Sequence, residues 1–299
     1  VYSRPARQSS ALALQVNSWY TLGPPSCVVR NTILRDETLA MTRTGNRYYV
    51  EALARGLRIL DAFTEQTPSL SLTEISSAVG LDKSTVFRFV YTYERLGYLL
   101  RDPETKRYRP GLNVLRLGFA ALSSLGLPQI SQPYLRALSK LTGETTNMTV
   151  LDGREIVHVA RNATQQNIII NLELGSQLPA YCTSMGKAQF VDKPRGDLSD
   201  LLGQRPYPAT GPTTITSLHA LVAELEKVRE QGYAINDEEL VAGLRSVAAP
   251  IRDSEGRIVA AINVSVPVAR VSRQELEDDL APKVMNAARE ISLALGAEL

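Results

Sequence analysis

Basic, hydroxyl and aromatic side chains are grouped along one side of a predicted helix that begins shortly after Gly80. Lys and Arg can reach a phosphate or the edge of a guanine, and short Ser and Thr hydroxyls suit phosphates or bases. A solvated helix whose first residues serve only as caps is the alternative, and the flanking elements decide between the two. The side chains in question are Lys83, Ser84, Thr85, Arg88, Tyr91 and Thr92.

The elements around this helix favour contact with nucleic acid. A helical pattern precedes it, and a capping-box pattern, Ser71 followed by Glu74, opens a second helix that Gly80 ends. After the helix, "YLLRDPETKRYRPG" gives two short extended runs around a turn. Three helices followed by a hairpin predict a winged helix-turn-helix, which places the start of its last helix in the DNA major groove. In the hairpin, or wing, Lys106 and Arg107 suit phosphate or minor-groove contacts.

Strand and helix patterns alternate in the remainder of the chain, which predicts an α+β domain around an antiparallel sheet. Residues 111–126 form a short apolar helix that acts as a connector, and Gly126, Pro128 and Pro133 mark the boundary after it. The later helices cover residues 217–232 and a segment that starts at the Ser272–Glu275 capping box. The predicted strands cover residues 146–153, 155–161, 167–175, 245–253 and 257–267.

These boundaries divide the chain into four parts. Residues 1–45 lack sustained periodicity, so we expect a disordered or mis-annotated N-terminal extension, with Met41 as the physiological start. The DNA-binding domain follows at 46–110, the linker helix at 111–128 and the effector-binding domain at 129–299.

Composition sets limits on the class of protein. Of the 299 residues, 44% are hydrophobic and 21% charged, which is ordinary for a soluble globular protein. No apolar run reaches the roughly 18 residues that span a bilayer. Cys27 and Cys182 are the only cysteines, so a reducing cytoplasm fits better than a secreted disulfide framework. Residues 46–110 carry ten Lys and Arg against eight Asp and Glu, a weakly basic balance that permits DNA binding without proving it.

An enzyme built on the C-terminal domain is the alternative function. Cys182 can act as a nucleophile if His158 lies beside it as a base, although each residue type is more often structural. His158 and His219 lack metal-ligand spacing, and no glycine loop for phosphate is present, so we expect no metal and no cofactor. The charged run at 236–240 is more often a solvated turn than an acid/base pair. An oligomeric interaction protein, which binds neither DNA nor effector, is a third possibility.

Five stretches in order resemble the IclR family of bacterial transcriptional regulators. They are "YVEALARGLRILDAF", "SLTEISSAVGLDKSTVFRFVYTYERLGYL", "YCTSMGKA", "TTITSLHALVAELEKVREQGYAINDEE" and "GLRSVAAPIRDSEGRIVAAINVSVPVAR". The first and third further resemble the subgroup that controls protocatechuate, 4-hydroxybenzoate and β-ketoadipate catabolism. The resemblance implies a winged-helix domain, a linker helix, a GAF-like domain that binds a small effector, and homodimers or homotetramers.

The same resemblance implies an effector site in the C-terminal domain. Its helix start in "TSMGKA" offers backbone N–H groups to a carboxylate, an arrangement that suits an anion. Some relatives have Asp and Cys where this chain has Asn236 and Ser246, so the preferred ligand polarity is expected to differ. Ordinary capping and sheet-surface polar groups are the alternative interpretation. The matched positions are Ser184, Met185, Asn236, Ser246, Asn263 and Ser265.

The sequence therefore predicts a cytoplasmic regulator that binds double-stranded promoter DNA. Its C-terminal domain is expected to sense a small organic acid, aromatic or dicarboxylic, and no membrane is involved. Effector binding then shifts the population between DNA-competent arrangements.

Overall fold

The computed structural model describes residues 48–64, 66–164, 172–203 and 206–298 of the chain. The predicted N-terminal extension and Met41 lie outside the described residues. Within them the fold mixes helices and strands, which form an N-terminal part and a C-terminal part. None of the described helices combines the length and the apolar character needed to cross a bilayer.

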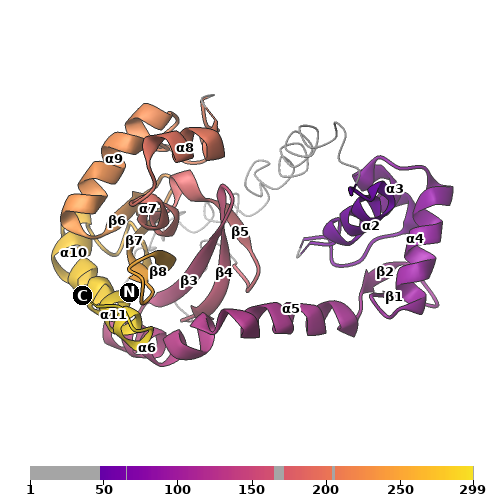
Figure 1. Cartoon of the computed structure of the whole chain (residues 1–299), viewed down its shortest axis with the longest axis horizontal. Coiled ribbons are helices and arrows are strands. Elements are labelled where there is room, and N and C mark those ends of the chain that lie inside the picture. Colours follow the sequence, from indigo (N-terminus) through magenta and orange to yellow (C-terminus); the bar gives the residue numbers. More distant parts are fainter. Residues whose placement is uncertain (1–47, 65, 165–171, 204–205, 299) are drawn as a thin grey trace, which may run out of the picture. The chain divides into compact units, whose positions relative to one another are not determined.

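The N-terminal part is the predicted winged helix-turn-helix (Figure 1). Helix α2 spans Glu51–Asp61, α3 spans Leu72–Val79 and α4 spans Lys83–Arg95. Strands β1 (Leu99–Arg101) and β2 (Tyr108–Pro110) pair antiparallel and form the wing. One small apolar core joins these elements, and its buried side chains are Ile59, Leu70, Ile75, Val86, Val90, Leu99 and Tyr108.

Local sequence fixes where α3 and α4 begin. Ser71 accepts a hydrogen bond from the N–H of Glu74, and the Glu74 carboxylate accepts one from the N–H of Ser71 at 2.7 Å, so the predicted capping box is present. Asp82 caps α4 by accepting from the N–H of Thr85 at 2.9 Å and from the Ser84 hydroxyl at 2.6 Å. Asp82 is a capping residue that the sequence patterns did not single out, and it sets the start of α4.

The C-terminal part is built on a six-stranded antiparallel sheet with strand order β5-β4-β3-β8-β7-β6. Strands β3 (Thr145–Asp152) and β4 (Glu155–Asn162) form one predicted hairpin. Strands β7 (Leu244–Arg252) and β8 (Ile258–Pro267) form the other. Strands β5 (Gln177–Pro179) and β6 (Ala234–Asp237) lie at the two edges. The predicted fold class, an α+β domain around an antiparallel sheet, is confirmed.

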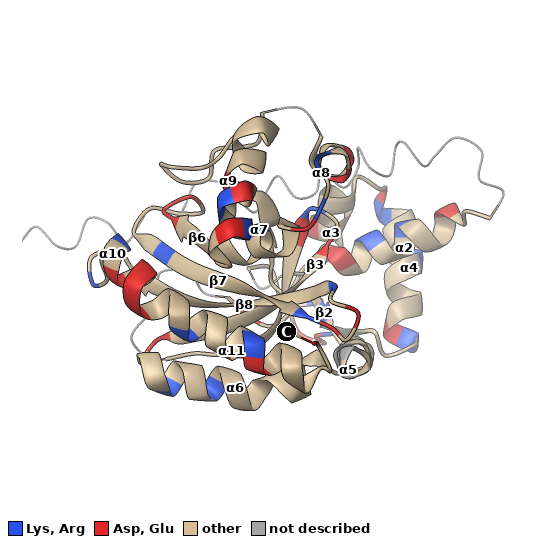
Figure 2. Cartoon of the chain, turned by 60° about the vertical axis from the view of Figure 1, so that its left-hand side comes forward, with Lys and Arg blue, Asp and Glu red and all other residues tan. Residues whose placement is uncertain are grey.

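Helices cover both faces of this sheet (Figure 2). Helices α6 (Leu127–Thr142) and α11 (Ala281–Ala294) pack on one face, in a core that includes Ile262 and Val264 of β8. Helices α7 (Ser184–Phe190), α8 (Arg195–Leu202) and α9 (Leu218–Gln231) lie on the other face. Because successive strand residues point to opposite faces, Asn263 and Ser265 share one face, as predicted. This face is the one that α7 covers.

The connection between the two parts differs from the sequence pattern. The break expected across Gly126, Pro128 and Pro133 is confined to Gly126, whose φ of 65° separates α5 (Leu112–Leu125) from α6. Pro128 occupies the first turn of α6, where a backbone N–H has no helical partner in any case. Pro133 lies inside α6, so proline content alone overestimated the length of the break.

Two other predicted elements differ in detail. The strand predicted at 167–175 lies mostly outside the described residues, and residues 172–175 are not in a strand. The Ser272–Glu275 capping box is present and begins α10 (Arg273–Glu275). A π-helical segment, Leu276–Leu280, then joins α10 to α11. Helical periodicity predicted one continuous helix here and gave no sign of the π-helical segment.

Candidate functional site

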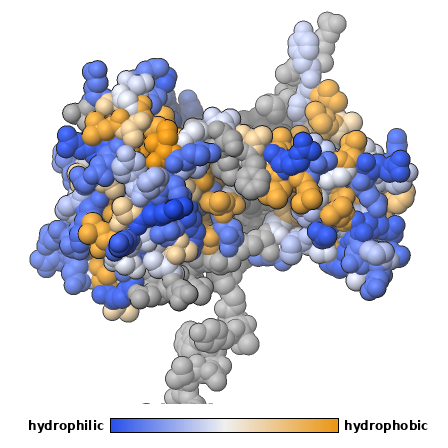
Figure 3. All heavy atoms as spheres, turned by 90° about the horizontal axis from the view of Figure 1, so that it is seen from below, coloured by the Kyte–Doolittle hydropathy of each residue, from blue (hydrophilic) through white to orange (hydrophobic). Residues whose placement is uncertain are grey.

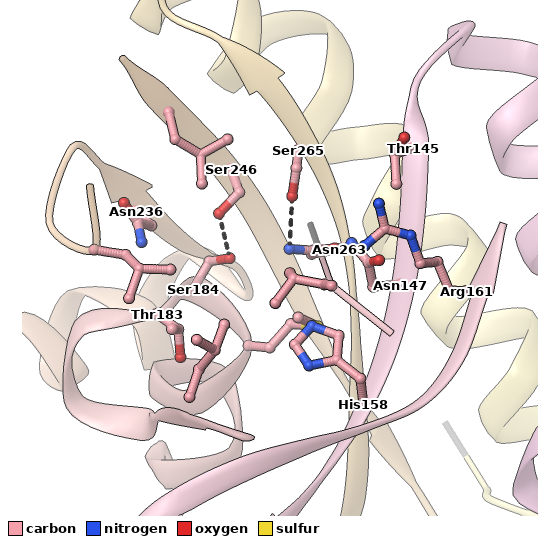
Figure 4. Close-up of a pocket in the computed structure, with 15 residues that line it drawn as sticks. Thr145, Asn147, His158, Arg161, Thr183, Ser184, Asn236, Ser246, Asn263 and Ser265 are labelled. Atoms are coloured by element: carbon pink, nitrogen blue, oxygen red, sulfur yellow. Dashed lines mark hydrogen bonds between the residues drawn. The ribbon is translucent and has the colours of Figure 1, made fainter. Parts of the chain in front are cut away.

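A polar cavity lies on the face of the sheet that α7 covers (Figure 4). Its volume is ≈ 50 Å³, more than the ~10–15 Å³ that one water molecule needs. Strands β3, β4, β7 and β8, the end of β6 and the start of α7 all contribute to its lining. The residues predicted for the effector site all line it: Ser184, Met185, Asn236, Ser246, Asn263 and Ser265. Their convergence is a feature of the structure, whereas their role toward a ligand stays a prediction.

A close backbone approach at Gly186 packs the start of α7 against the short 3-10 turn that precedes it, Ala180–Cys182. A Cβ at this position would lie 2.1 Å from the carbonyl oxygen of Ala180, so the packing requires glycine. Thr183 caps the helix by accepting a hydrogen bond from the N–H of Gly186 at 3.1 Å. The N–H groups of Ser184 and Met185 stand in the first turn and have no acceptor within the helix. These amides and the positive end of the helix favour a negatively charged group in the cavity.

Hydrogen bonds join the polar side chains of the cavity into two short chains. Ser184 Oγ lies 2.7 Å from Ser246 Oγ, which links α7 to β7. Asn147 Nδ2 donates to Asn263 Oδ1 at 2.9 Å, and Asn263 Nδ2 donates to Ser265 Oγ at 3.1 Å. Strand register explains this grouping, because Ser246 lies opposite Ser265 and Asn147 lies opposite Asn263. The side chains are thus held in place before any ligand arrives, which reduces the ordering cost of binding.

Asn236 lines the cavity and also braces the backbone around it. Its Nδ2 donates to the carbonyl of Cys182 at 2.8 Å, and its Oδ1 accepts from the N–H of Glu239 at 3.1 Å. These bonds tie the turn before α7 to the loop after β6, which carries the cavity-lining residue Leu240. The motif that predicted a ligand contact for Asn236 gave no sign of this second role.

Sequence reasoning missed several cavity-lining polar residues, and most of them lie on β3 and β4. The alternation of Thr145 and Asn147 along β3 is a signal that could have found two of them. The neighbouring Thr146 and Thr149 are also polar, so alternation alone does not separate the two faces of this strand. The missed residues are Thr145, Asn147, His158, Arg161 and Thr183.

His158 is a neutral histidine in the cavity wall. It is 1% exposed, and burial lowers its pKa to about 4, an effect that the Ser176 carbonyl opposes and the Arg161 charge reinforces. Its Nδ1 lies 3.2 Å from the carbonyl oxygen of Ser176. A carbonyl oxygen only accepts, so Nδ1 carries the proton and Nε2 presents a lone pair.

Cys182 and His158, the pair considered for an enzyme, each hydrogen-bond to a backbone carbonyl. Cys182 is buried in the apolar core around α7, and its thiol donates to the carbonyl of Pro179 at 3.7 Å. His158 lines the cavity and hydrogen-bonds to the carbonyl of Ser176. Among the described residues, no group of three or more His, Cys, Asp or Glu side chains could hold a metal ion.

A buried ion pair fastens α7 to the loop after β6. Lys187 is fully buried, and its ammonium donates to Glu239 Oε1, while Glu224 Oε1 of α9 lies 3.7 Å away. Burial raises the pKa of Glu239, and the charge of Lys187 opposes that rise. The pair lies one turn along α7 from the cavity-lining residues Ser184 and Met185, so it stabilises the helix start that faces the cavity.

The second candidate surface is the outer side of α4. Lys83, Arg88 and Tyr91 are exposed there, as a contact surface for DNA requires. The Ser84 hydroxyl already donates to Asp82, and the Thr92 hydroxyl donates to the carbonyl of Arg88 at 2.8 Å. These two hydroxyls can therefore only accept from a partner, which narrows the role predicted for them. Thr85 is half-buried.

An aromatic side chain on the same side of α4 was not predicted. Phe87 is 48% exposed and lies beside Tyr91, with 6.2 Å between the ring centroids. An apolar ring on this surface can contact a thymine methyl group.

In the wing, Lys106 and Arg107 differ. Lys106 is exposed at the turn and donates to the carbonyl of Pro103. Arg107 is half-buried, pairs with Glu74 at 2.9 Å and donates to the carbonyl of Ser69 at 2.7 Å. Arg107 therefore holds the wing to the start of α3, in addition to any contact with phosphate.

Comparison with known protein families gives two matches that together follow this architecture. Residues 52–103 match the IclR helix-turn-helix domain, and residues 119–293 match the bacterial transcriptional regulator IclR C-terminal domain. The chain belongs to the IclR family. The predicted resemblance is thus confirmed, and this IclR-family chain is a transcriptional regulator with a DNA-binding helix-turn-helix domain.

Individual relatives match the IclR-family chain over most of its length. It is 39% identical to the Pca regulon regulatory protein of Pseudomonas putida over 249 residues, 83% of this chain and 85% of that protein. It is 34% identical to the HTH-type transcriptional regulator XynR of Escherichia coli K12 over 247 residues, 83% of this chain and 98% of that one. The crystal structure of the regulator RHA06195 from Rhodococcus sp. RHA1 has a TM-score of 0.72 at 37% identity, covering 83% of this chain and 98% of that one.

Proposed function

We propose that this regulator binds promoter DNA through α4 and the wing, and responds to a small organic acid, an intermediate of aromatic catabolism, bound in the cavity beside α7. The observation that carries the proposal is the meeting of the six predicted effector-site residues in one cavity. Polar side chains from several chain segments meet in one cavity, where the first amides of α7 favour an anion. The choice of an aromatic acid follows the resemblance of two sequence stretches to the aromatic-catabolism subgroup, and the similarity to the Pca regulon regulatory protein agrees with it.

An aromatic acid needs more room than the cavity has in this conformation. The cavity measures ≈ 50 Å³, whereas an engineered cavity that binds benzene measures about 150 Å³. Four leucine side chains form the apolar part of the lining together with Met185, so movement of the leucines is the means of enlarging the cavity. A ligand that binds only the enlarged form shifts the population toward that form, which is how an effector alters DNA binding. The leucines are Leu172, Leu178, Leu240 and Leu244.

The DNA contacts are assigned from exposure and chemistry. Lys83 and Arg88 are exposed cations on α4, suited to phosphate or guanine, and Tyr91 lies on the same side. Lys106 at the tip of the wing is an exposed cation suited to phosphate. Ser84 and Thr92 complete the proposed surface of α4 as acceptors, together with Thr85 in its first turn. Arg107 adds a second cation in the wing.

The proposal also covers the organisation of the chain. Residues 46–110 form the DNA-binding domain, 111–128 the linker helix and 129–299 the effector-binding domain. Apolar residues reach the surface in several patches between hydrophilic ones (Figure 3). On α5, Leu112 is 72% exposed and Leu117 is 63% exposed. Exposed apolar side chains of this kind support self-association as a homodimer or homotetramer. Promoter binding assigns the protein to the cytoplasm.

The test uses fluorescence anisotropy with a labelled promoter fragment from the region upstream of the chain's own gene. Arg88→Ala should weaken specific binding by about 1–3 kcal/mol, because a lost base contact costs that much. Arg289→Ala, an exposed arginine on α11, is the matched control and should leave binding unchanged. If Arg88→Ala binds as tightly as the control, α4 does not read the promoter through Arg88. If the wild type fails to distinguish the promoter from random DNA, the proposed function is wrong.

A further inference from the structure

Two buried polar atoms in the cavity wall have no hydrogen-bond partner among the described residues. They are Asn147 Oδ1 and His158 Nε2. The two residues are 2% and 1% exposed, and both line the cavity. Buried polar atoms without partners are rare in native proteins, because each has given up its hydrogen bonds to water. Two of them in one cavity call for an explanation.

Both atoms are acceptors. Asn147 uses its Nδ2 to donate to Asn263, which leaves the carbonyl oxygen Oδ1 of its side chain. The proton of His158 lies on Nδ1, against the carbonyl of Ser176, so Nε2 offers only its lone pair. In Figure 4 the His158 ring extends from β4 toward the other side chains of the cavity, and Asn147 lies beside Arg161.

We propose that the effector is a hydroxylated organic acid, whose hydroxyl groups donate hydrogen bonds to Asn147 Oδ1 and His158 Nε2. This inference rests on the proposed function of the cavity as the effector site. It adds that the ligand must carry hydroxyl donors, whereas the amides at the start of α7 require only that the ligand be an anion. A hydroxyl is a donor and an acceptor at once, so it satisfies a buried acceptor while its own oxygen can accept from Arg161.

A dicarboxylic acid is the main competitor, because Arg161 is a cation in the same wall. An ionised carboxylate only accepts hydrogen bonds. Placed at this end of the cavity, it would set further acceptors against Asn147 Oδ1 and His158 Nε2 and leave both atoms unsatisfied. The hydrogen-bonding pattern therefore selects hydroxyl groups over a second carboxylate.

The experiment is isothermal titration calorimetry on the full chain with matched pairs of acids. One pair is 3,4-dihydroxybenzoate and benzoate, and the other is gluconate and hexanoate, so aromatic and aliphatic sources of hydroxyl groups are tested separately. Adipate represents a dicarboxylate without hydroxyls. Within at least one pair, the hydroxylated acid should bind about tenfold more tightly or better, the factor for one hydrogen bond of ordinary strength. Adipate or the hydroxyl-free acids binding as tightly as the hydroxylated ones would overturn the inference.

A substitution assigns the effect to the cavity wall. His158→Phe keeps a ring of similar size and removes the Nε2 acceptor, so the advantage of the hydroxylated acid should fall about tenfold while benzoate or hexanoate binds as before. His219→Phe changes the chain's other histidine, which is exposed on α9, and should alter neither acid. An unchanged ratio in a folded His158→Phe protein would overturn the assignment. If that variant does not fold, the ratios measured on the wild type decide the inference.

Promoter binding, measured without any acid, keeps this inference apart from the proposed function. If the chain binds its promoter fragment but none of the hydroxylated acids, the hydroxyl inference fails and the DNA-binding function stands. If it binds hydroxylated acids but no promoter, the inference on the cavity holds and the proposed regulation of DNA binding is wrong.

Discussion

Replacing Lys187 by methionine should destabilise the C-terminal domain far more than the loss of a surface charge. The Lys187 side chain is fully buried, and its ammonium pairs with the buried carboxylate of Glu239. Methionine keeps most of the volume and removes the positive charge, so a buried negative charge is left without its partner. Breaking a buried pair in this way typically costs about 3–5 kcal/mol. For a domain of this size that corresponds to a drop of about 6–20 °C in Tm.

The size of the effect depends on the protonation of Glu239, and this gives the prediction a second signature. Burial raises the pKa of Glu239 above its ordinary value, and removing Lys187 takes away a charge that opposes the rise. A carboxyl whose folded pKa is raised binds more protons in the folded state than in the unfolded state. The free energy of unfolding of Lys187→Met should therefore increase as pH falls through that raised pKa toward the unfolded value.

Urea unfolding followed by circular dichroism measures these free energies, with unchanged m-values as the sign that only stability has changed. Lys187→Met with Glu239→Gln removes both charges and should recover most of the loss, because no uncompensated charge remains buried. Lys283→Met is the matched control, since Lys283 pairs with the exposed Asp279 at 2.7 Å. Such a surface pair contributes about 0–1 kcal/mol. If Lys187→Met costs no more than this control, water reaches the Lys187–Glu239 pair and the reasoning is refuted.

Three further predictions concern DNA, effector and pH. Lys106→Ala combined with Arg107→Ala should weaken specific and nonspecific DNA binding alike. In a plot of the logarithm of the binding constant against the logarithm of the salt concentration, the slope should become shallower by about one to two units. A change in sequence preference alone would mean that the wing reads bases. Ser246→Val or Ser265→Val should preserve operator affinity without effector. Each should raise the effector concentration that alters operator binding by at least about tenfold, because a ligand polar group left unpaired costs about 1–3 kcal/mol. An unchanged effector titration of operator binding would place the ligand elsewhere. Because burial lowers the pKa of His158 to about 4, below the unfolded value of about 6.5, the unfolded state binds a proton first as pH falls. Wild-type stability should therefore drop by up to about 3 kcal/mol relative to His158→Phe between about pH 6.5 and 4, and equal urea midpoints across this range would contradict it.

The local elements and the family could be predicted from sequence because their signals lie within a few residues of each other. The Ser71–Glu74 capping box is a contact between residues three positions apart, and it forms in the structure as expected. The alternation that turns Asn263 and Ser265 away from Ile262 follows from the pleat of a strand alone. Proline content was a poorer guide, because Pro133 is tolerated within α6.

The composition of the cavity was decided by tertiary structure. Asn147 meets Asn263 across 116 positions, and Lys187 meets Glu239 across 52, so each pair depends on how strands register and helices pack. His158 appeared in sequence as a polar residue in an apolar strand, and only the packing of the sheet determines that its Nε2 is buried without a hydrogen-bond partner among the described residues. Sequence periodicity specifies which face of an element is buried. Which polar atoms are left unsatisfied on that face depends on every element packed against it, and it is these atoms that define the chemistry the cavity requires of a ligand.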